Sequence, residues 1–279
     1  VRNQGLELAL NYNNTWKDFT WNTGVTYSMN KNKILTLADN AINPITREKF
    51  SISSLNMGGL GSTRFILKEG GSMGDIYSLM DLKRDANGAV YIDENNSVVT
   101  GSLEANNYIK LGSVLPKVNL AWRNNFSWKN INVAFLVSAR LGGVVFSRTQ
   151  AVLDNFGVSE ASAAARDKGY VSVNGNDRVN PEGWYSVVAG GTAVPQYYIY
   201  SATNIRLQEA SIGYTIPKKW LGNGCDIKVS LIGRNLWMIY NKAPFDPESV
   251  ASTDNFYQGI DYFMMPSLRN IGFNLSFKF

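Results

Sequence analysis

The sequence predicts an all-β protein whose long antiparallel strands cross a membrane as a β-barrel. Three observations support this class: apolar and polar residues alternate strictly, the alternating segments are long, and short turns alternate with long loops. The segments run to about 11–13 residues, whereas soluble strands average five or six and a tilted strand needs about 9–11 to cross a bilayer.

Seven segments carry a clear period of two, the repeat of a strand with one apolar face. They are residues 6–12, 19–29, 118–128, 131–141, 205–216, 227–239 and 270–279. Near Gln208 and Glu209 the alternation slips by one residue, which predicts a β-bulge. Residues 63–68 and 75–84 are weaker strand candidates and bring the count to about nine. An odd number is unusual for a bacterial single-chain barrel, so the count favours part of a larger barrel.

The expected connections are of two kinds. Short turns are expected at 14–17 and 128–130, with a nine-residue turn at 217–225. Long loops are expected at 31–62, 85–115, 142–201 and 240–266, and a short helix at 159–168 within the third of them. Short turns at one end and long loops at the other are typical of outer-membrane barrels.

Aromatic residues concentrate near the short turns, where an interfacial girdle would lie. They are Tyr12, Trp16, Phe19, Trp21, Phe126, Trp128, Tyr214 and Trp220. A soluble sandwich with an aromatic core would explain the alternation equally well. It would not explain strand length, loop asymmetry and girdle placement together.

The composition excludes several classes of site. The chain has no histidine and a single cysteine, Cys225, which excludes histidine-based triads, the usual zinc sites and an internal disulfide. No apolar run is long enough for a transmembrane helix. The net charge of +5 is not clustered, so no nucleic-acid partner is expected. We predict neither an enzyme nor a cofactor or metal site.

Two acidic motifs have simple structural interpretations. Residues 85–95 are rich in oxygen ligands but lack the spacing of a calcium loop, and Asn87–Gly88 predicts a hairpin turn instead. Asp246 and Glu248 could form a hydrolytic carboxylate pair, but with Pro247 between them a proline-braced turn is the simpler expectation.

Several segments resemble the C-terminal end of SusC/RagA-type TonB-dependent outer-membrane transporters. They are RLQEASIGYTIPKKW (206–220), DIKVSLIGRNLWMIYN (226–241) and FDPE (245–248). Further matches lie at NQGLELALNYNN (3–14), SMNKNKI (28–34), LKEGGSMGDIYSL (67–79) and LGSVLPKVNLAWRNNFSWKN (111–130). The resemblance therefore runs through nearly the whole chain in the order of the family.

The resemblance implies that residues 1–279 are the C-terminal portion of a larger barrel of about 22 strands. The plug domain and N-terminal strands are absent from this chain, so Val1 is expected to be a cut and Phe279 the true end. The implied location is the outer membrane of a Gram-negative bacterium. The implied function is active import of oligosaccharides or oligopeptides, with a SusD-like surface lipoprotein and with TonB acting through the missing part.

Two alternatives remain open. One is a TonB-dependent receptor for siderophores or cobalamin, and the other is a soluble all-β carbohydrate-binding or adhesin domain. Glycan and peptide cargo are not distinguished by the sequence.

Candidate contact residues lie in two aromatic-rich loop segments. We expect contact with substrate or lipoprotein at Trp184, Tyr185, Tyr197, Tyr198, Tyr200, Tyr257, Tyr262 and Phe263. The polar strand faces carry Glu7, Lys117, Arg123, Lys228 and Arg234, which would line a wet lumen or pair across strands.

The terminal segment NIGFNLSFKF alternates to its last residue. Its apolar residues would face lipid. Through the resemblance, Phe273, Leu275, Phe277 and Phe279 are expected to form the signal that the barrel-assembly machinery reads.

Overall fold

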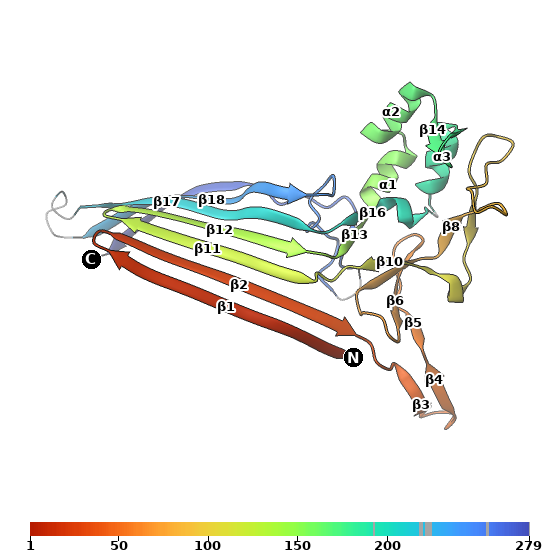
Figure 1. Ribbon diagram of the computed structural model, residues 1–279, viewed down its shortest axis with the longest axis horizontal. Helices are drawn as coiled ribbons and strands as arrows, with labels where there is room; N and C mark the ends of the chain where they lie inside the picture. Colours follow the sequence, from red (N-terminus) through yellow and green to blue (C-terminus); the bar gives the residue numbers. More distant parts are fainter. Residues whose placement is uncertain (192, 218–219, 221–224, 255–256, 279) are drawn as a thin grey trace.

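A sheet of seven long antiparallel strands dominates the molecule. The computed structural model describes residues 1–191, 193–217, 220, 225–254 and 257–278. In sheet order the strands are β1 (Arg2–Trp16), β2 (Phe19–Lys33), β11 (Val118–Trp128), β12 (Ile131–Leu141), β17 (Asn204–Ile216), β18 (Asp226–Asn241) and β20 (Asn270–Lys278). They run side by side along the long axis of the molecule, with short turns at one end and long loops at the other (Figure 1).

The strand register gives the sheet one apolar and one polar face. Residues that pair across strands lie on the same face, so each row of paired residues belongs to one face. One row consists of Leu10, Val25, Trp122, Val137 and Leu207. The adjacent row on the other face consists of Asn11, Gly24, Arg123, Leu136, Glu209, Arg234 and Asn270. We call these sides the apolar face and the polar face.

Aromatic rings form the predicted band at the turn end of the apolar face. The last complete row there is Trp16, Phe19, Trp128, Ile131, Tyr214, Val229 and Leu275. The rings of Trp16 and Phe19 stack at 6.0 Å between centroids, and Phe126 lies 6.2 Å from both Phe19 and Trp21. The rings of Trp16, Phe19, Trp21 and Phe126 therefore form one continuous patch.

The segments between the long strands at the other end fold together into what we call the loop unit (residues 34–117, 142–203 and 242–269). Its strands are β3 (Ala38–Ile42), β4 (Lys49–Ile52), β5 (Ser54–Asn56), β6 (Thr63–Lys68), β7 (Asp75–Ser78), β8 (Met80–Leu82), β9 (Thr100–Ser102), β10 (Ile109–Ser113), β13 (Val144–Ser147), β14 (Val171–Val173), β15 (Asp177–Val179), β16 (Ile199–Ser201) and β19 (Ile260–Asp261). Its helices are α1 (Arg148–Asn155), α2 (Glu160–Lys168) and α3 (Pro181–Val188), with 3-10 turns η1 (Ala105–Asn107) and η2 (Pro195–Tyr198).

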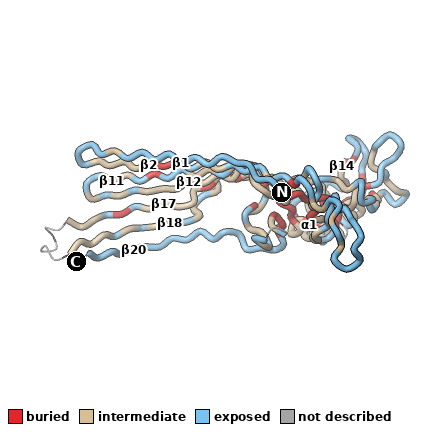
Figure 2. Tube along the Cα trace, turned by 90° about the horizontal axis from the view of Figure 1, so that it is seen from below, coloured by how far each residue is buried: buried red, intermediate tan, exposed pale blue. Residues whose placement is uncertain are grey.

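The hydrophobic core lies in the loop unit. Its fully buried side chains include Phe65, Ile76, Val98, Phe146 and Ile260. Figure 2 shows buried residues gathered at this end, while the long strands are mostly exposed or partly exposed. The long loops are thus packed together around a common core.

The sequence-based assignments differ from the structure in two respects. Residues 63–68 form β6 as predicted, and residues 75–84 divide into β7 and β8, but these strands belong to the loop unit. Among the described residues, the long sheet therefore has seven strands, not nine. Helix α2 was predicted, whereas α1 and α3 were missed because neither shows a long amphipathic repeat.

The predicted bulge is present and has a counterpart in the next strand. The register shifts between Leu207 and Glu209 on β17, and Gln208 is the extra residue. On β18 the residues opposite are Asn235, which has a positive φ of 50°, and Leu236. This second irregularity interrupts the alternation expected over 227–239, because Leu236 lies over Gly233 on the apolar face. Trp237 pairs with Leu207, as the alternation predicts, and also borders a hollow beside Arg206.

Candidate functional site

Helix α3 and the following turn bring the first group of predicted contact residues together. Asn180 caps α3 by accepting a hydrogen bond from the Glu182 amide, and Pro181 occupies the first turn. The Trp184 ring then meets the Tyr197 ring edge-on, with centroids 5.1 Å apart. Tyr197 is 42% exposed, so this aromatic pair is open to the surface at one ring.

Tyr185 borders a hollow of about 690 Å³ between α1, α2 and α3. Arg166 and Glu182 also line it, so its wall combines an aromatic ring with both signs of charge. Such a mixed lining suits a polar ligand with an apolar part.

Tyr198 occupies a different environment from its neighbours. It is 2% exposed, and its hydroxyl donates a hydrogen bond of 3.0 Å to Asp154. Burial, together with the charge and hydrogen bond of Asp154, raises the pKa of Tyr198 far above its ordinary value. Tyr198 therefore holds η2 against α1 as a permanent donor and offers no surface for contact.

Tyr200 contacts the loop that follows β18. Its ring meets Phe245 edge-on at 5.4 Å between centroids. This contact joins two loops that are far apart in the sequence.

The second group of predicted residues is positioned by β13 and β19, which pair in parallel. The hydroxyl of Ser147 donates a buried hydrogen bond of 2.6 Å to Asp261, and the Phe263 amide donates to the Thr149 hydroxyl. Tyr262 and Phe263 are 46% and 54% exposed, and their rings lie 5.5 Å apart. Tyr257 is also exposed and contacts Phe65.

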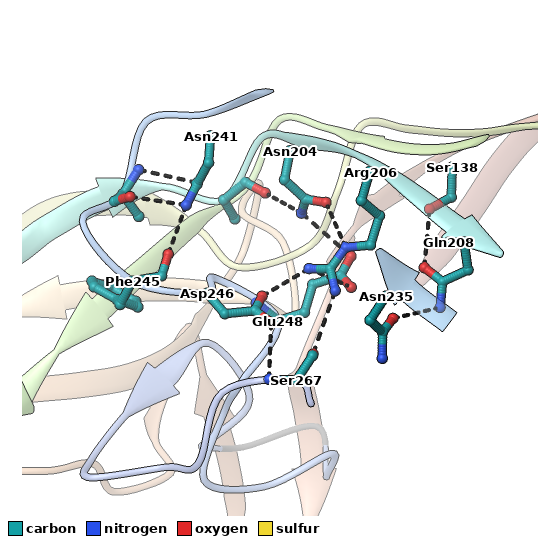
Figure 3. A network of polar contacts seen from close by, with 12 residues as sticks. Ser138, Asn204, Arg206, Gln208, Asn235, Asn241, Phe245, Asp246, Glu248 and Ser267 are labelled. Carbon is teal, nitrogen blue, oxygen red and sulfur yellow. Dashed lines mark hydrogen bonds and ion pairs between the residues drawn. The ribbon is translucent and has the colours of Figure 1, made fainter. Parts of the chain in front are cut away.

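Arg206 forms a buried ion network that the sequence did not predict (Figure 3). Its side chain is 5% exposed and lies 2.8 Å from Asp246 and 3.1 Å from Glu248. It also donates to the Ser267 hydroxyl at 3.4 Å, and the Ser267 amide donates to Asp246. The network fixes both ends of the β18–β20 loop against the polar face of β17.

Asp246 remains ionised within this network. Burial alone would raise the pKa of Asp246, but hydrogen bonds from Ser267, Arg206 and the Glu248 amide, together with the charge of Arg206, lower it below the ordinary value. The hydrogen bond from the Glu248 amide to the Asp246 carboxylate closes the turn predicted around Pro247. Both carboxylates thus form ion pairs with Arg206. This arrangement differs from that of a hydrolytic carboxylate pair.

A hollow of about 420 Å³ lies beside this network. Arg206, Asp246, Arg269, Trp237 and Phe245 are among its lining residues. Guanidinium groups next to aromatic rings can bind carboxylate, hydroxyl or amide groups of a ligand. Sequence reasoning missed this site because only the loop fold brings Arg206 to Asp246, 40 positions later.

The charged residues predicted for the polar face lie on that face wherever they pair with a residue of a neighbouring strand. Glu7 pairs with Ser28, Arg123 with Gly24, and Lys228 with Ser276. Arg234 forms an exposed ion pair of 3.1 Å with Glu209 on the neighbouring strand. Of the two expectations for these residues, pairing across strands is present at Arg234.

The terminal strand presents its apolar residues on the apolar face. Phe273, Leu275 and Phe277 pair with Leu231, Val229 and Ile227 of β18 and are all exposed. Phe279, the last residue of the predicted assembly signal, lies outside the described residues.

The remaining sequence expectations concern metals and helices. Asp85 accepts hydrogen bonds from the amides of Asn87 and Ala89, which forms the predicted hairpin turn. Within the described residues no group of three or more acidic, cysteine or histidine side chains is placed to hold a metal ion. None of the helices described is long and apolar enough to span a membrane.

Comparison with known proteins gives sequence relatives over the full chain. No family model matches. TonB-dependent receptor P3 of Formosa agariphila is 25% identical over 316 aligned positions, and TonB-dependent receptor P26 of the same organism is 28% identical over 302. Each match covers all of this chain and 29% of the relative, so the chain spans under a third of their length.

Solved structures give the same fold. The structure of the RagAB peptide transporter matches 99% of this chain and 29% of its own chain, with a TM-score of 0.66 at 15% identity. The RagAB peptide importer in its closed-closed state matches with a TM-score of 0.65 at 14% identity. The predicted all-β barrel class is confirmed: this chain is similar in sequence to part of two TonB-dependent receptors and in fold to part of the RagAB transporter.

Proposed function

We propose that this chain forms part of the wall and the external loops of a TonB-dependent importer in the outer membrane of a Gram-negative bacterium. The observation that carries the proposal is the two-faced sheet. Ten residues separate Leu6 from Trp16 on the apolar face of β1. At about 3.4 Å per residue and a tilt of about 40°, they span roughly 26 Å, close to the apolar band of about 25 Å in outer-membrane barrels.

We further propose that residues 1–279 are the C-terminal portion of that barrel. Among the described residues, β1 and β20 pair with a neighbour on one side only. An unpaired strand edge in lipid would leave several backbone donors and acceptors without partners, each at a cost of several kcal/mol. Further strands of the same barrel would cover both edges, and the greater length of the receptors P3 and P26 supports this.

The proposed cargo is an oligosaccharide or an oligopeptide, imported without chemical change. The exposed rings of Tyr197, Tyr257, Tyr262 and Phe263 lie in the loop unit at one end of the sheet and can stack on sugar faces or peptide side chains. The same surface would be covered by a SusD-like lipoprotein. TonB would act through the part of the receptor outside this chain.

The alternating residues of β20 have a proposed role in assembly. Phe273, Leu275 and Phe277 face outward in the edge strand, where the barrel-assembly machinery can reach them. With Phe279 they would form the recognition signal for insertion.

Uptake by living cells tests the transport proposal. A strain lacking the gene of the whole receptor should lose accumulation of labelled oligopeptides or oligosaccharides, and a plasmid copy should restore it. Cargo recovered from the cells' periplasm at early times should have unchanged mass. Normal uptake in the deletion strain for both cargo classes would refute the proposal, and cleavage of cargo by the purified receptor would refute the non-enzymatic part.

A further inference from the structure

A hollow of about 460 Å³ lies on the apolar face, over β12, β17, β18 and β20. Its floor is formed by two small residues, Ala210 and Gly233, which pair directly with each other. Phe135, Ile212 and Ile271 form part of its wall. The hollow exists because the two central strands carry almost no side-chain volume at this row.

The double bulge explains why the hollow is apolar throughout. Gln208 and Asn235 turn toward the polar face, where the Gln208 amide donates to Asn235 at 3.3 Å and its oxygen accepts from the Ser138 hydroxyl. Leu207 and Leu236, the residues beside them, remain on the apolar face and border the hollow. The bulges therefore move the polar groups of this region to the other side of the sheet.

The hollow lies near the middle of the apolar band. Gly233 is six residues from Ile227, the outermost apolar residue of β18 at the turn end. This separation corresponds to roughly 15 Å of depth at a tilt of about 40°, which is half of a hydrocarbon core about 30 Å thick. An occupant with its polar group at a membrane surface can reach this depth only with a long hydrocarbon chain.

We propose that this hollow binds the distal part of an acyl chain of a membrane phospholipid. The inference rests on the proposed membrane-spanning function. Ser211 also borders the hollow, but its pairing with Ala134 and Ile232 places its side chain on the opposite face of the sheet, so the lining presents an apolar surface to an occupant. The hollow is continuous with the face that would contact the bilayer. An apolar recess left empty would lack partner atoms on one side, whereas a flexible acyl chain restores these contacts.

Two substitutions fill the hollow by different routes. Ala210→Ile adds three carbon atoms directly over the floor. Gly233→Ala adds a methyl group that would lie 2.5 Å from a terminal methyl group of Leu236. Because this distance is too short, the Leu236 side chain must move, and it moves into the hollow. Ala139→Ile is the matched control, because Ala139 lies on the same face, paired with Leu120 and Ile205, and does not border the hollow.

The experiment uses the whole receptor purified from outer membranes, delipidated in detergent and incubated with palmitoyl-oleoyl phosphatidylethanolamine. Native mass spectrometry then measures the fraction that keeps one phospholipid. Each methylene lost from burial weakens binding by about fourfold, so displacement of two methylenes should lower affinity by roughly tenfold or more. We expect this loss for both filling variants and no loss for Ala139→Ile.

Three results would overturn the proposal. Equal phospholipid retention in all four proteins would show that the hollow holds no acyl chain. Retention of lipopolysaccharide with none of the phospholipid would assign a different lipid. A change of oligomeric mass in the filling variants, with lipid retention unchanged, would show that a protein covers the hollow. Absence of the unaltered receptor from the outer membrane would instead refute the proposed function.

Discussion

Two arginines on the polar face form ion pairs that contribute very differently to stability. Arg206 is almost completely buried among Asp246 and Glu248, whereas the pair of Arg234 with Glu209 is more than 40% exposed on both sides. Exposed pairs contribute about 0–1 kcal/mol, whereas loss of one partner from a buried pair costs about 3–5 kcal/mol. Burial therefore decides which of the two ion pairs holds the structure.

The substitution Arg206→Met tests this difference. It should remove the arginine partner from the buried Asp246 carboxylate and from the Glu248 carboxylate, which is 36% exposed, and release the β18–β20 loop from the wall. Limited proteolysis of the whole receptor should then cleave within residues 242–269 at least tenfold faster, while the control Arg234→Met should leave the rate nearly unchanged. Equal protection of both variants would contradict the proposed role of Arg206.

The same network gives a prediction for pH. Because the pKa of folded Asp246 is lowered, its contribution to stability is complete above the ordinary value of 3.8 and is lost as pH falls through the lower folded value. The loop should therefore stay docked throughout the neutral and mildly acidic range. Proteolytic release of residues 242–269 with a midpoint above pH 5 would contradict this assignment, and the acid protease pepsin allows the low-pH measurement.

A polar pair on the apolar face is a third residue-level feature. The Trp21 indole donates a 3.1 Å hydrogen bond to Asn124, which is 1% exposed. Trp21→Phe removes this donor from a buried amide and should destabilise the barrel by about 1–3 kcal/mol. The double variant Trp21→Phe with Asn124→Leu removes both partners and should recover most of the loss in urea unfolding of the barrel in lipid vesicles. A double variant no more stable than Trp21→Phe would contradict this account.

At the level of elements, the bulge at Gln208 sets the register of the last strands. Deleting Gln208 would shift residues 209–216 by one position and turn their apolar side chains to the polar face. The deletion should abolish the heat-modifiable, folded band of the receptor on a gel. Gln208→Ala keeps the residue count and should retain that band. Normal assembly of the deletion variant would show that the register adapts without the bulge.

Local patterns explain which elements the sequence predicted. Alternation with a period of two depends only on neighbouring residues, so it identified the seven long strands, the Gln208 bulge and the aromatic band. Helix α3 is short, but Asn180 followed by Pro181 is a start signal that could have revealed it. Arg206 and the buried position of Tyr198 depend on partners 40 or more residues away, which no local pattern records.

At the scale of the whole molecule, two ends of one sheet have different tasks. The long strands keep apolar residues exposed on one face, which is stable only against another apolar phase. The loop unit instead has its own buried core, so its exposed aromatic residues are held on a firm support. This division matches the proposed combination of a membrane-spanning wall with an external surface that meets cargo and a lipoprotein.

Spin-label accessibility along β1 tests the central claim, that the sheet crosses the bilayer with its apolar face toward lipid. Single cysteines would replace residues 6 to 12 in turn, in the whole receptor with Cys225→Ser, reconstituted in lipid vesicles. Accessibility to oxygen, which dissolves in lipid, should peak at positions 6, 8, 10 and 12. Accessibility to a water-soluble nickel complex should peak at 7, 9 and 11. Uniform access of the nickel complex to all seven positions would contradict the account.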